Sequence, residues 1–165
     1  MFGEMYNSLS YLSLILCLSL SWSQPFSLTD MNLQYHVSTD AQTWYQALIN
    51  CKGAGMDLVS INSAEEQERL EMFLKENGFN KGYWLSGTNL GNDNNNYSWA
   101  STGEPVVYTK WLPGQPDNTI HEKNRGENCI QWGMYEESPE PAGWNDMFCR
   151  QKLQYICQES DNKRC

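Results

Sequence analysis

Two stretches of the chain combine a helix N-cap signal with apolar residues at helical spacing. In the first, Thr43 and Gln46 form a capping box, whose side chains bind the free backbone N–H groups of a first helical turn. We expect this helix at residues 44–54, with nearby glycines as its stop. The residues that share its apolar face are Ala47, Leu48, Cys51 and Ala54.

The second capping box, at Ser63 and Glu66, predicts a helix that ends at Asn77-Gly78. Neither helix carries residues that suggest catalysis or ligand binding, so both are interpreted as parts of the scaffold. The apolar residues expected to face inward from the second helix are Leu70, Phe73 and Leu74.

Runs rich in β-branched and aromatic residues predict strands around these helices. Trp99, Trp111 and Trp144 are expected to be core aromatic residues. The expected strands are an edge strand at Tyr35–Val37 and further strands at residues 56–61, 83–87, 127–131 and 153–157.

The amino-terminal region has the pattern of a secretion signal. Residues 9–20 are rich in leucine and serine, and the small residues Ser21 and Ser23 follow, as a signal peptidase requires. This apolar run is shorter than the roughly 20 residues of a membrane span. We therefore interpret residues 1–23 as the signal peptide of a secreted, extracellular protein. The alternative is a retained membrane anchor, because the region lacks positive side chains and contains Glu4.

Charge and cysteine content narrow the function classes. The 165 residues carry a formal net charge of −9 at pH 7, and an acidic domain without a lysine or arginine cluster repels nucleic acid. Of the six cysteines, Cys17 would leave with the signal peptide. Five cysteines remain, and disulfide bonds are expected among them in a secreted chain. Any four of them can form two disulfides in three ways, and the spacing does not choose between these pairings.

Side chains that present oxygen gather between Trp111 and Cys149: Gln115, Asp117, Glu127, Asn128, Asn145 and Asp146. Individually, such residues are most often turn formers. Three carboxylates that converged between disulfide-held loops would repel one another unless a cation neutralised them. An oxygen-only set suits Ca²⁺, which takes about six to eight oxygens, whereas zinc would require nitrogen or sulfur ligands.

The order of these residues resembles the primary sugar site of the C-type lectins. The shared motifs are Gln115-Pro116-Asp117, then Glu127 two residues before a cysteine, then Trp144-Asn145-Asp146 three residues before another. The resemblance covers residues 35–158. Residues 24–34 lack the cysteine pair of the longer form, which indicates the short form. The chain resembles the secreted, single-domain type, similar to the insect galactose-specific C-type lectins.

This resemblance implies an α+β fold, with two helices packed on small antiparallel sheets and a long calcium-binding loop region. After the signal peptide and an N-terminal segment at 24–34, residues 35–160 would form the carbohydrate-recognition domain, followed by a tail at 161–165. Cys165 would form either an interchain bridge in a disulfide-linked dimer or a capped thiol in the tail. The implied intradomain disulfides are Cys51 with Cys157 and Cys129 with Cys149.

The resemblance also implies one bound Ca²⁺, with Pro116 in the cis form and the backbone carbonyl of Asp146 contributing. The implied ligands are Gln115, Asp117, Glu127, Asn145 and Asp146, and the same side chains together with His121 would contact the sugar.

Galactose and N-acetylgalactosamine are expected in preference to mannose. Gln115 and Asp117 place an amide donor before a carboxylate acceptor, an order that resembles galactose-type sites, whereas Glu-Pro-Asn marks mannose-type sites. Galactose-selective relatives often carry a tryptophan just after this motif, where this chain offers only Ile120 or His121. The expected selectivity is therefore modest.

Two other functions are compatible with parts of the pattern. Glu127 and Asp146 could be imagined as a glycosidase acid and base, but every oxygen of the cluster is needed as a metal ligand, so no enzymatic activity is expected. The sharper alternative is a lectin-like domain that binds a protein surface. Relatives of that kind usually lose the metal ligands, whereas every motif position is filled here.

The polar run at residues 91–96 does not fit an EF-hand, which requires a central glycine and a distal glutamate. It is interpreted either as a flexible asparagine-rich loop or, by the resemblance, as part of an auxiliary calcium site. Asn96 begins an Asn-Tyr-Ser tripeptide and is the expected N-glycosylation site. The residues of the auxiliary site would be Asn89, Asp93, Asn118, Glu127 and Asn128.

Overall fold

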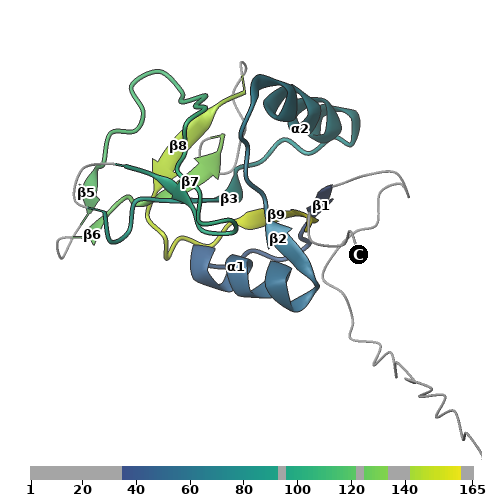
Figure 1. The fold of residues 1–165 in the computed structure, drawn as a ribbon, viewed down its shortest axis with the longest axis horizontal. Helices are drawn as coiled ribbons and strands as arrows, with labels where there is room; N and C mark the ends of the chain where they lie inside the picture. Colours follow the sequence, from purple (N-terminus) through teal and green to yellow (C-terminus); the bar gives the residue numbers. More distant parts are fainter. Residues whose placement is uncertain (1–34, 93–95, 122–124, 134–141, 161–165) are drawn as a thin grey trace, which may run out of the picture.

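The computed structural model describes residues 35–92, 96–121, 125–133 and 142–160. The expected signal peptide, the segment at 24–34, Asp93, the tail with Cys165 and the side chain of His121 lie outside the described residues. The described part folds into two helices and a set of short strands (Figure 1). The expected α+β class is confirmed.

Helix α1 spans Trp44–Gly53 and has Thr43 as its N-cap, as predicted, while the Gln46 side chain donates to Asn50 Oδ1. The Thr43 hydroxyl oxygen accepts a hydrogen bond of 3.3 Å from the Gln46 N–H. The indole of Trp44 donates to the Leu85 carbonyl at 2.8 Å, which fixes the start of the helix on the sheet. Near its other end, Cys51 forms a disulfide with Cys157 of the last strand, as expected.

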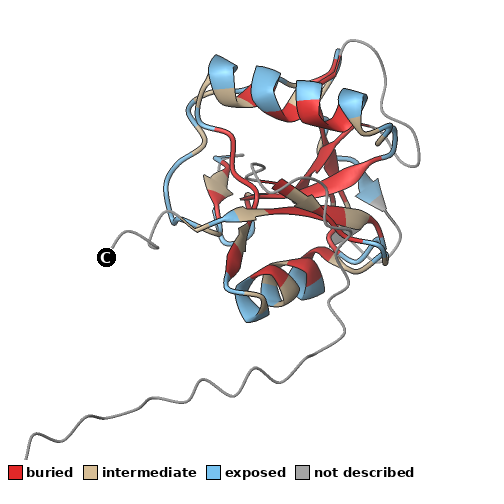
Figure 2. Cartoon of the chain, turned by 90° about the vertical axis from the view of Figure 1, so that its right-hand side faces the viewer, coloured by how far each residue is buried: buried red, intermediate tan, exposed pale blue. Residues whose placement is uncertain are grey.

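Helix α2 spans Ala64–Glu76, with Ser63 as its N-cap. The Ser63 hydroxyl oxygen accepts from the Glu66 N–H at 3.2 Å, while the Glu66 carboxylate accepts from the Asn62 N–H at 2.7 Å. In Figure 2 the buried residues of both helices face the strands that lie between them. The inward residues of α2 are Leu70, Phe73 and Leu74, as predicted.

The strands form one connected sheet in the order β1-β9-β3-β7-β8, with β2 paired to β9 and β4 paired to β3. The expectation of purely antiparallel sheets misses one pair, because β3 and β9 run parallel. A separate two-stranded pair, β5 with β6, lies at the left edge of Figure 1. The bounds are β1 Tyr35–Val37, β2 Met56–Leu58, β3 Tyr83–Thr88, β4 Ser98–Trp99, β5 Ile120–His121, β6 Arg125–Gly126, β7 Cys129–Trp132, β8 Trp144–Met147 and β9 Gln154–Glu159.

The observed strands differ from the expected ones in several places, including the following three. The strand predicted at 56–61 ends at Leu58, because the next residue, Val59, bonds singly to Ile156 and to Ser86 and does not continue a ladder. The strand predicted at 127–131 is shifted to β7, Cys129–Trp132. Asn145 and Asp146, expected on a loop, lie within β8.

Close packing where β3 meets β7 leaves no room for a side chain at Gly87. A β-carbon there would lie 2.7 Å from Cγ1 of Ile130 and 3.1 Å from Cζ3 of Trp99, and both of these side chains are fully buried. Ile130 pairs with Asp146 in the next strand. The glycine therefore allows the approach of the strands that lead to Asp146.

Gly87→Ala is expected to lower the free energy of unfolding by about 1–3 kcal/mol, because an extra methyl group would overpack the core. Gly53→Ala is the matched control, since a β-carbon at this helix position meets nothing within 4 Å and alanine favours a helix by up to about 1 kcal/mol. Urea unfolding of both variants measures the difference. Equal stability of the two variants would contradict the packing argument.

Candidate metal centre

Three carboxylates from separate parts of the chain converge at one end of the sheet. Asp117 follows the Gln115-Pro116 bond, Glu127 lies between β6 and β7, and Asp146 lies in β8. One oxygen from each lies within 4.8 Å of the others. Glu127 and Asp146 are 5% and 0% exposed, whereas Asp117 is exposed. Negative charge is therefore concentrated in a partly buried place.

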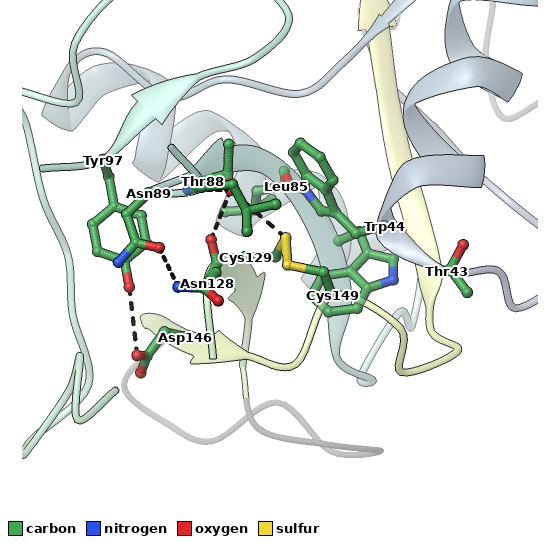
Figure 3. The surroundings of a disulfide bond; sticks show 12 residues. Thr43, Trp44, Leu85, Thr88, Asn89, Tyr97, Asn128, Cys129, Asp146 and Cys149 are labelled. Atoms are coloured by element: carbon green, nitrogen blue, oxygen red, sulfur yellow. Dashed lines mark hydrogen bonds between the residues drawn. A yellow bond between two sulfur atoms is a disulfide. The ribbon is translucent and has the colours of Figure 1, made fainter. Parts of the chain in front are cut away.

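The segments that carry Glu127 and Asp146 are joined by the Cys129–Cys149 disulfide (Figure 3). Cys129 begins β7, and Cys149 lies two residues after the end of β8. The two strands are paired in register, with Ile130 opposite Asp146. The predicted pairing of both intradomain disulfides is confirmed.

The Asp146 carboxylate accepts hydrogen bonds from two successive backbone groups. The Asp117 N–H donates to Oδ1 at 3.1 Å, and the Asn118 N–H donates to Oδ2 at 2.8 Å. Asn118 has a φ of 51°, in the left-handed region, which asparagine tolerates better than most residues. The Tyr97 hydroxyl approaches Oδ2 at 3.4 Å (Figure 3).

The pKa of Asp146 is raised in spite of the hydrogen bonds from these N–H groups. Burial of the carboxyl group is the largest cause, and the N–H groups of Asn118 and Asp117 oppose it. Burial, followed by the nearby charge of Asp146, also raises the pKa of Tyr97. The site therefore penalises negative charge, and a cation there would relieve the penalty.

Asp117 lies in a different environment because its carboxylate is exposed. Its Oδ1 accepts from the Thr119 hydroxyl at 2.7 Å and from the Thr119 N–H at 2.9 Å. These bonds, led by that of the hydroxyl, lower the pKa of Asp117. Gln115 Nε2 approaches Oδ2 at 3.4 Å. Asp117 is thus held as a charged acceptor.

The peptide bond between Gln115 and Pro116 is cis, as predicted. The Gln115 side-chain oxygen accepts from the Asp117 N–H at 3.1 Å. The two side chains that flank the proline are therefore brought together, with an amide beside a carboxylate.

Of the five predicted ligands, Gln115, Asp117 and Asp146 are joined by these hydrogen bonds, and Glu127 is brought near by the 4.8 Å spacing of the carboxylate oxygens. Asn145 precedes Asp146 in β8, is 3% exposed and pairs with Gln131. Successive side chains of a strand point to opposite faces, so the contacts of Asp146 do not fix the place of the Asn145 carboxamide. Ile120, one of the two candidates for the apolar side of a sugar, is 68% exposed in β5.

The residues considered for an auxiliary site form a chain of amides. Asn128 Nδ2 donates to Asn89 Oδ1 at 2.7 Å (Figure 3). Asn89 Nδ2 in turn approaches Asn118 Oδ1 at 3.4 Å. The structure therefore brings these three amides together as partners of one another.

Tyr97 and Thr119 are neighbours of the carboxylates that the sequence analysis does not identify. The contact of Tyr97 with Asp146 joins residues 49 positions apart, so no local sequence signal indicates it. Thr119 follows Asp117 by two residues, and an aspartate that bonds a donor two residues on is a known turn pattern. That spacing could have identified it.

The donor set fits a calcium ion. Oxygens at about 2.3–2.6 Å from a shared Ca²⁺ lie at most about 4.6–5.2 Å apart, and the three carboxylate oxygens lie within 4.8 Å of one another. The Gln115 side-chain oxygen, which accepts from the Asp117 N–H, is a neutral oxygen of the same hard type. These residues therefore have the spacing and chemistry to hold one ion.

No helix in the described residues has the length and apolar character needed to cross a membrane.

Comparison with known proteins agrees with this architecture. Residues 40–159 match the Lectin C-type domain family. Salivary C-type lectin 2 of Aedes albopictus is 28% identical over 133 residues, covering 78% of this chain and 85% of the relative. C-type lectin 37Da of Drosophila melanogaster is 32% identical over 146 residues, covering 81% and 76% respectively.

A solved structure shares the fold. The human scavenger receptor C-type lectin carbohydrate-recognition domain superposes with a TM-score of 0.63 at 25% identity, and the match covers 83% of this chain and 97% of that one. From the matched family, the two disulfides and the arrangement of helices and strands, we conclude that the chain belongs to the C-type lectin domain family.

Proposed function

We propose that this protein is a secreted, calcium-dependent lectin that prefers galactose-type glycans. The observation that carries the proposal is the convergence of Asp117, Glu127 and Asp146 within 4.8 Å, with two of the three carboxylates buried. Such a group is costly to bury without a compensating cation. The ion would be held by Gln115, Asp117, Glu127, Asn145 and Asp146.

A bound Ca²⁺ would supply the positive charge that holds two neighbouring sugar hydroxyls. The protein side chains would bind the same hydroxyls, so each hydroxyl must find both a donor and an acceptor. Gln115 can donate through its amide, and Asp117 can only accept. The 3.4 Å contact between Gln115 Nε2 and Asp117 Oδ2 supports this proposal, because it places the donor next to the acceptor.

The order of donor and acceptor supports galactose and N-acetylgalactosamine over mannose. A sugar whose hydroxyls do not match would leave a polar group unpaired, at a cost of about 1–3 kcal/mol. The exposed side chain of Ile120 offers an apolar surface of limited size for the sugar ring, and His121 remains a proposed contact. This small platform supports a modest selectivity.

The alternative is a lectin-like domain that binds a protein surface without sugar. The retained carboxylate cluster favours the sugar-binding proposal, because a protein-binding surface has no need of three converging acids. The glycosidase interpretation is rejected, since the C-type lectin domain is a binding domain and not an enzyme.

Secretion and N-glycosylation are proposed on separate grounds. Two disulfides are typical of extracellular chains, and one relative is named as a salivary lectin. Asn96 is exposed, which supports its modification as the first residue of an Asn-Tyr-Ser tripeptide.

Asp146→Asn is expected to weaken calcium binding by about tenfold or more, because calcium affinity depends on the number of charged ligands. Glu104→Gln, which neutralises an exposed carboxylate in the turn after β4, is the matched control. Calorimetric titration with calcium at neutral pH measures both, and thermal unfolding in EDTA checks the fold. The proposal fails if the parent protein binds no calcium or if the two variants bind it equally well.

Calcium affinity is expected to fall in mild acid. Burial raises the pKa of Asp146, so this carboxyl takes up a proton at a higher pH than an ordinary aspartate, whose pKa is about 3.9. Protons then compete with calcium as the pH drops from neutral toward that raised value. Calorimetry over a pH series checks this, and excess calcium should restore sugar binding at acid pH. A loss that excess calcium does not reverse would argue against competition.

The double substitution Gln115→Glu with Asp117→Asn is expected to shift the preference from galactose toward mannose, by roughly tenfold in relative affinity. Competition by free galactose and free mannose for binding to a glycan surface measures the ratio, with the parent protein as reference. A parent that already prefers mannose, or a swap that leaves the ratio unchanged, would show that this motif does not select the sugar.

A further inference from the structure

We infer that Thr119 is a positioning residue: its hydroxyl holds the Asp117 carboxylate in the orientation that calcium and sugar require. The inference rests on the proposed calcium site. It adds a residue that lies outside the ligand motif and contributes no proposed ligand atom of its own.

The Asp117 carboxylate is exposed, unlike that of Asp146. Asp146 is fully buried in β8 and accepts two backbone N–H groups, so its surroundings fix its carboxylate. Asp117 is exposed and has no such packing. Without another constraint, rotation about its side-chain bonds would move its oxygens away from the shared centre, and ordering it would lower the affinity for an ion.

Thr119 supplies that constraint through two bonds to one oxygen. Its hydroxyl donates to Asp117 Oδ1 at 2.7 Å, and its backbone N–H donates to the same atom at 2.9 Å. The hydroxyl bond is the shorter, and hydrogen bonds to a charged acceptor are stronger than neutral ones. With Oδ1 anchored from one residue, the carboxylate plane is fixed, and Oδ2 is turned toward Gln115 Nε2 at 3.4 Å.

Thr119 can be changed without disturbing the core, because its side chain is exposed. Thr119→Val keeps the shape and the backbone N–H but removes the hydroxyl, whereas Thr119→Ser keeps the hydroxyl and removes the methyl group. Thr102→Val is the matched control, since Thr102 is an exposed turn threonine whose hydroxyl oxygen accepts from the Glu104 N–H at 3.3 Å.

Calcium affinity is measured by calorimetry without sugar, and galactose affinity is then measured at saturating calcium. Thr119→Val is expected to weaken calcium binding by about two- to tenfold, which corresponds to one lost hydrogen bond. Galactose binding should remain weaker in this variant even with the ion site filled, because Asp117 also contacts the sugar. Thr119→Ser and Thr102→Val should bind calcium and galactose as the parent protein does, and every variant should unfold cooperatively in EDTA within a few degrees of the parent temperature.

The outcomes separate this inference from the proposed function. If the parent protein binds calcium and Thr119→Val binds it equally well, the inference is wrong while the proposed calcium site stands. If Thr119→Ser loses as much affinity as Thr119→Val, the methyl group matters and not the hydroxyl, which also overturns the inference. A parent protein that binds no calcium would overturn both.

Discussion

The structure of the site depends on keeping the Asp146 carboxylate buried beside two other acids. β8 is paired along its whole length with β7, and the Cys129–Cys149 disulfide joins the regions at their ends, so Asp146 is held away from water. The N–H groups of Asp117 and Asn118 compensate part of the cost. The second of these donors belongs to Asn118, whose φ of 51° lies in the left-handed region.

The helices contribute to this arrangement through the aromatic core. Trp144 precedes the ligand pair in β8, is fully buried and packs edge-on against Trp99 and Trp111, with ring centroids 5.5 and 5.8 Å away. Its indole donates to the Gln67 side chain of α2 at 2.9 Å. Trp144 and Asp146 are two residues apart, so they point to the same face of the strand. The contact between α2 and Trp144 therefore helps to hold the strand that carries Asp146.

Sequence patterns predicted most of the scaffold because the relevant signals are local. Thr43 and Ser63 bind N–H groups three residues away, so both helix starts could be recognised. The parallel pairing of β3 with β9 depends on residues about 70 positions apart, and no short pattern encodes it. Asn145 and Asp146 were placed on a loop because asparagine and aspartate are depleted in strands, yet pairing with β7 overrides that preference.

Two neighbouring polar clusters show why charge, and not polarity alone, identifies the candidate metal centre. Asn89, Asn118 and Asn128 each carry a donor and an acceptor, so they can satisfy one another, as the 2.7 Å bond from Asn128 to Asn89 shows. Ionised carboxylates can only accept, so Asp117, Glu127 and Asp146 cannot neutralise their own charge. The hydrogen bonds to Asp146 come from neutral groups and leave its burial penalty in place, since its pKa is still raised. The charge of the acidic cluster is therefore consistent with a calcium site, whereas the amide cluster beside it carries no charge for a cation to neutralise.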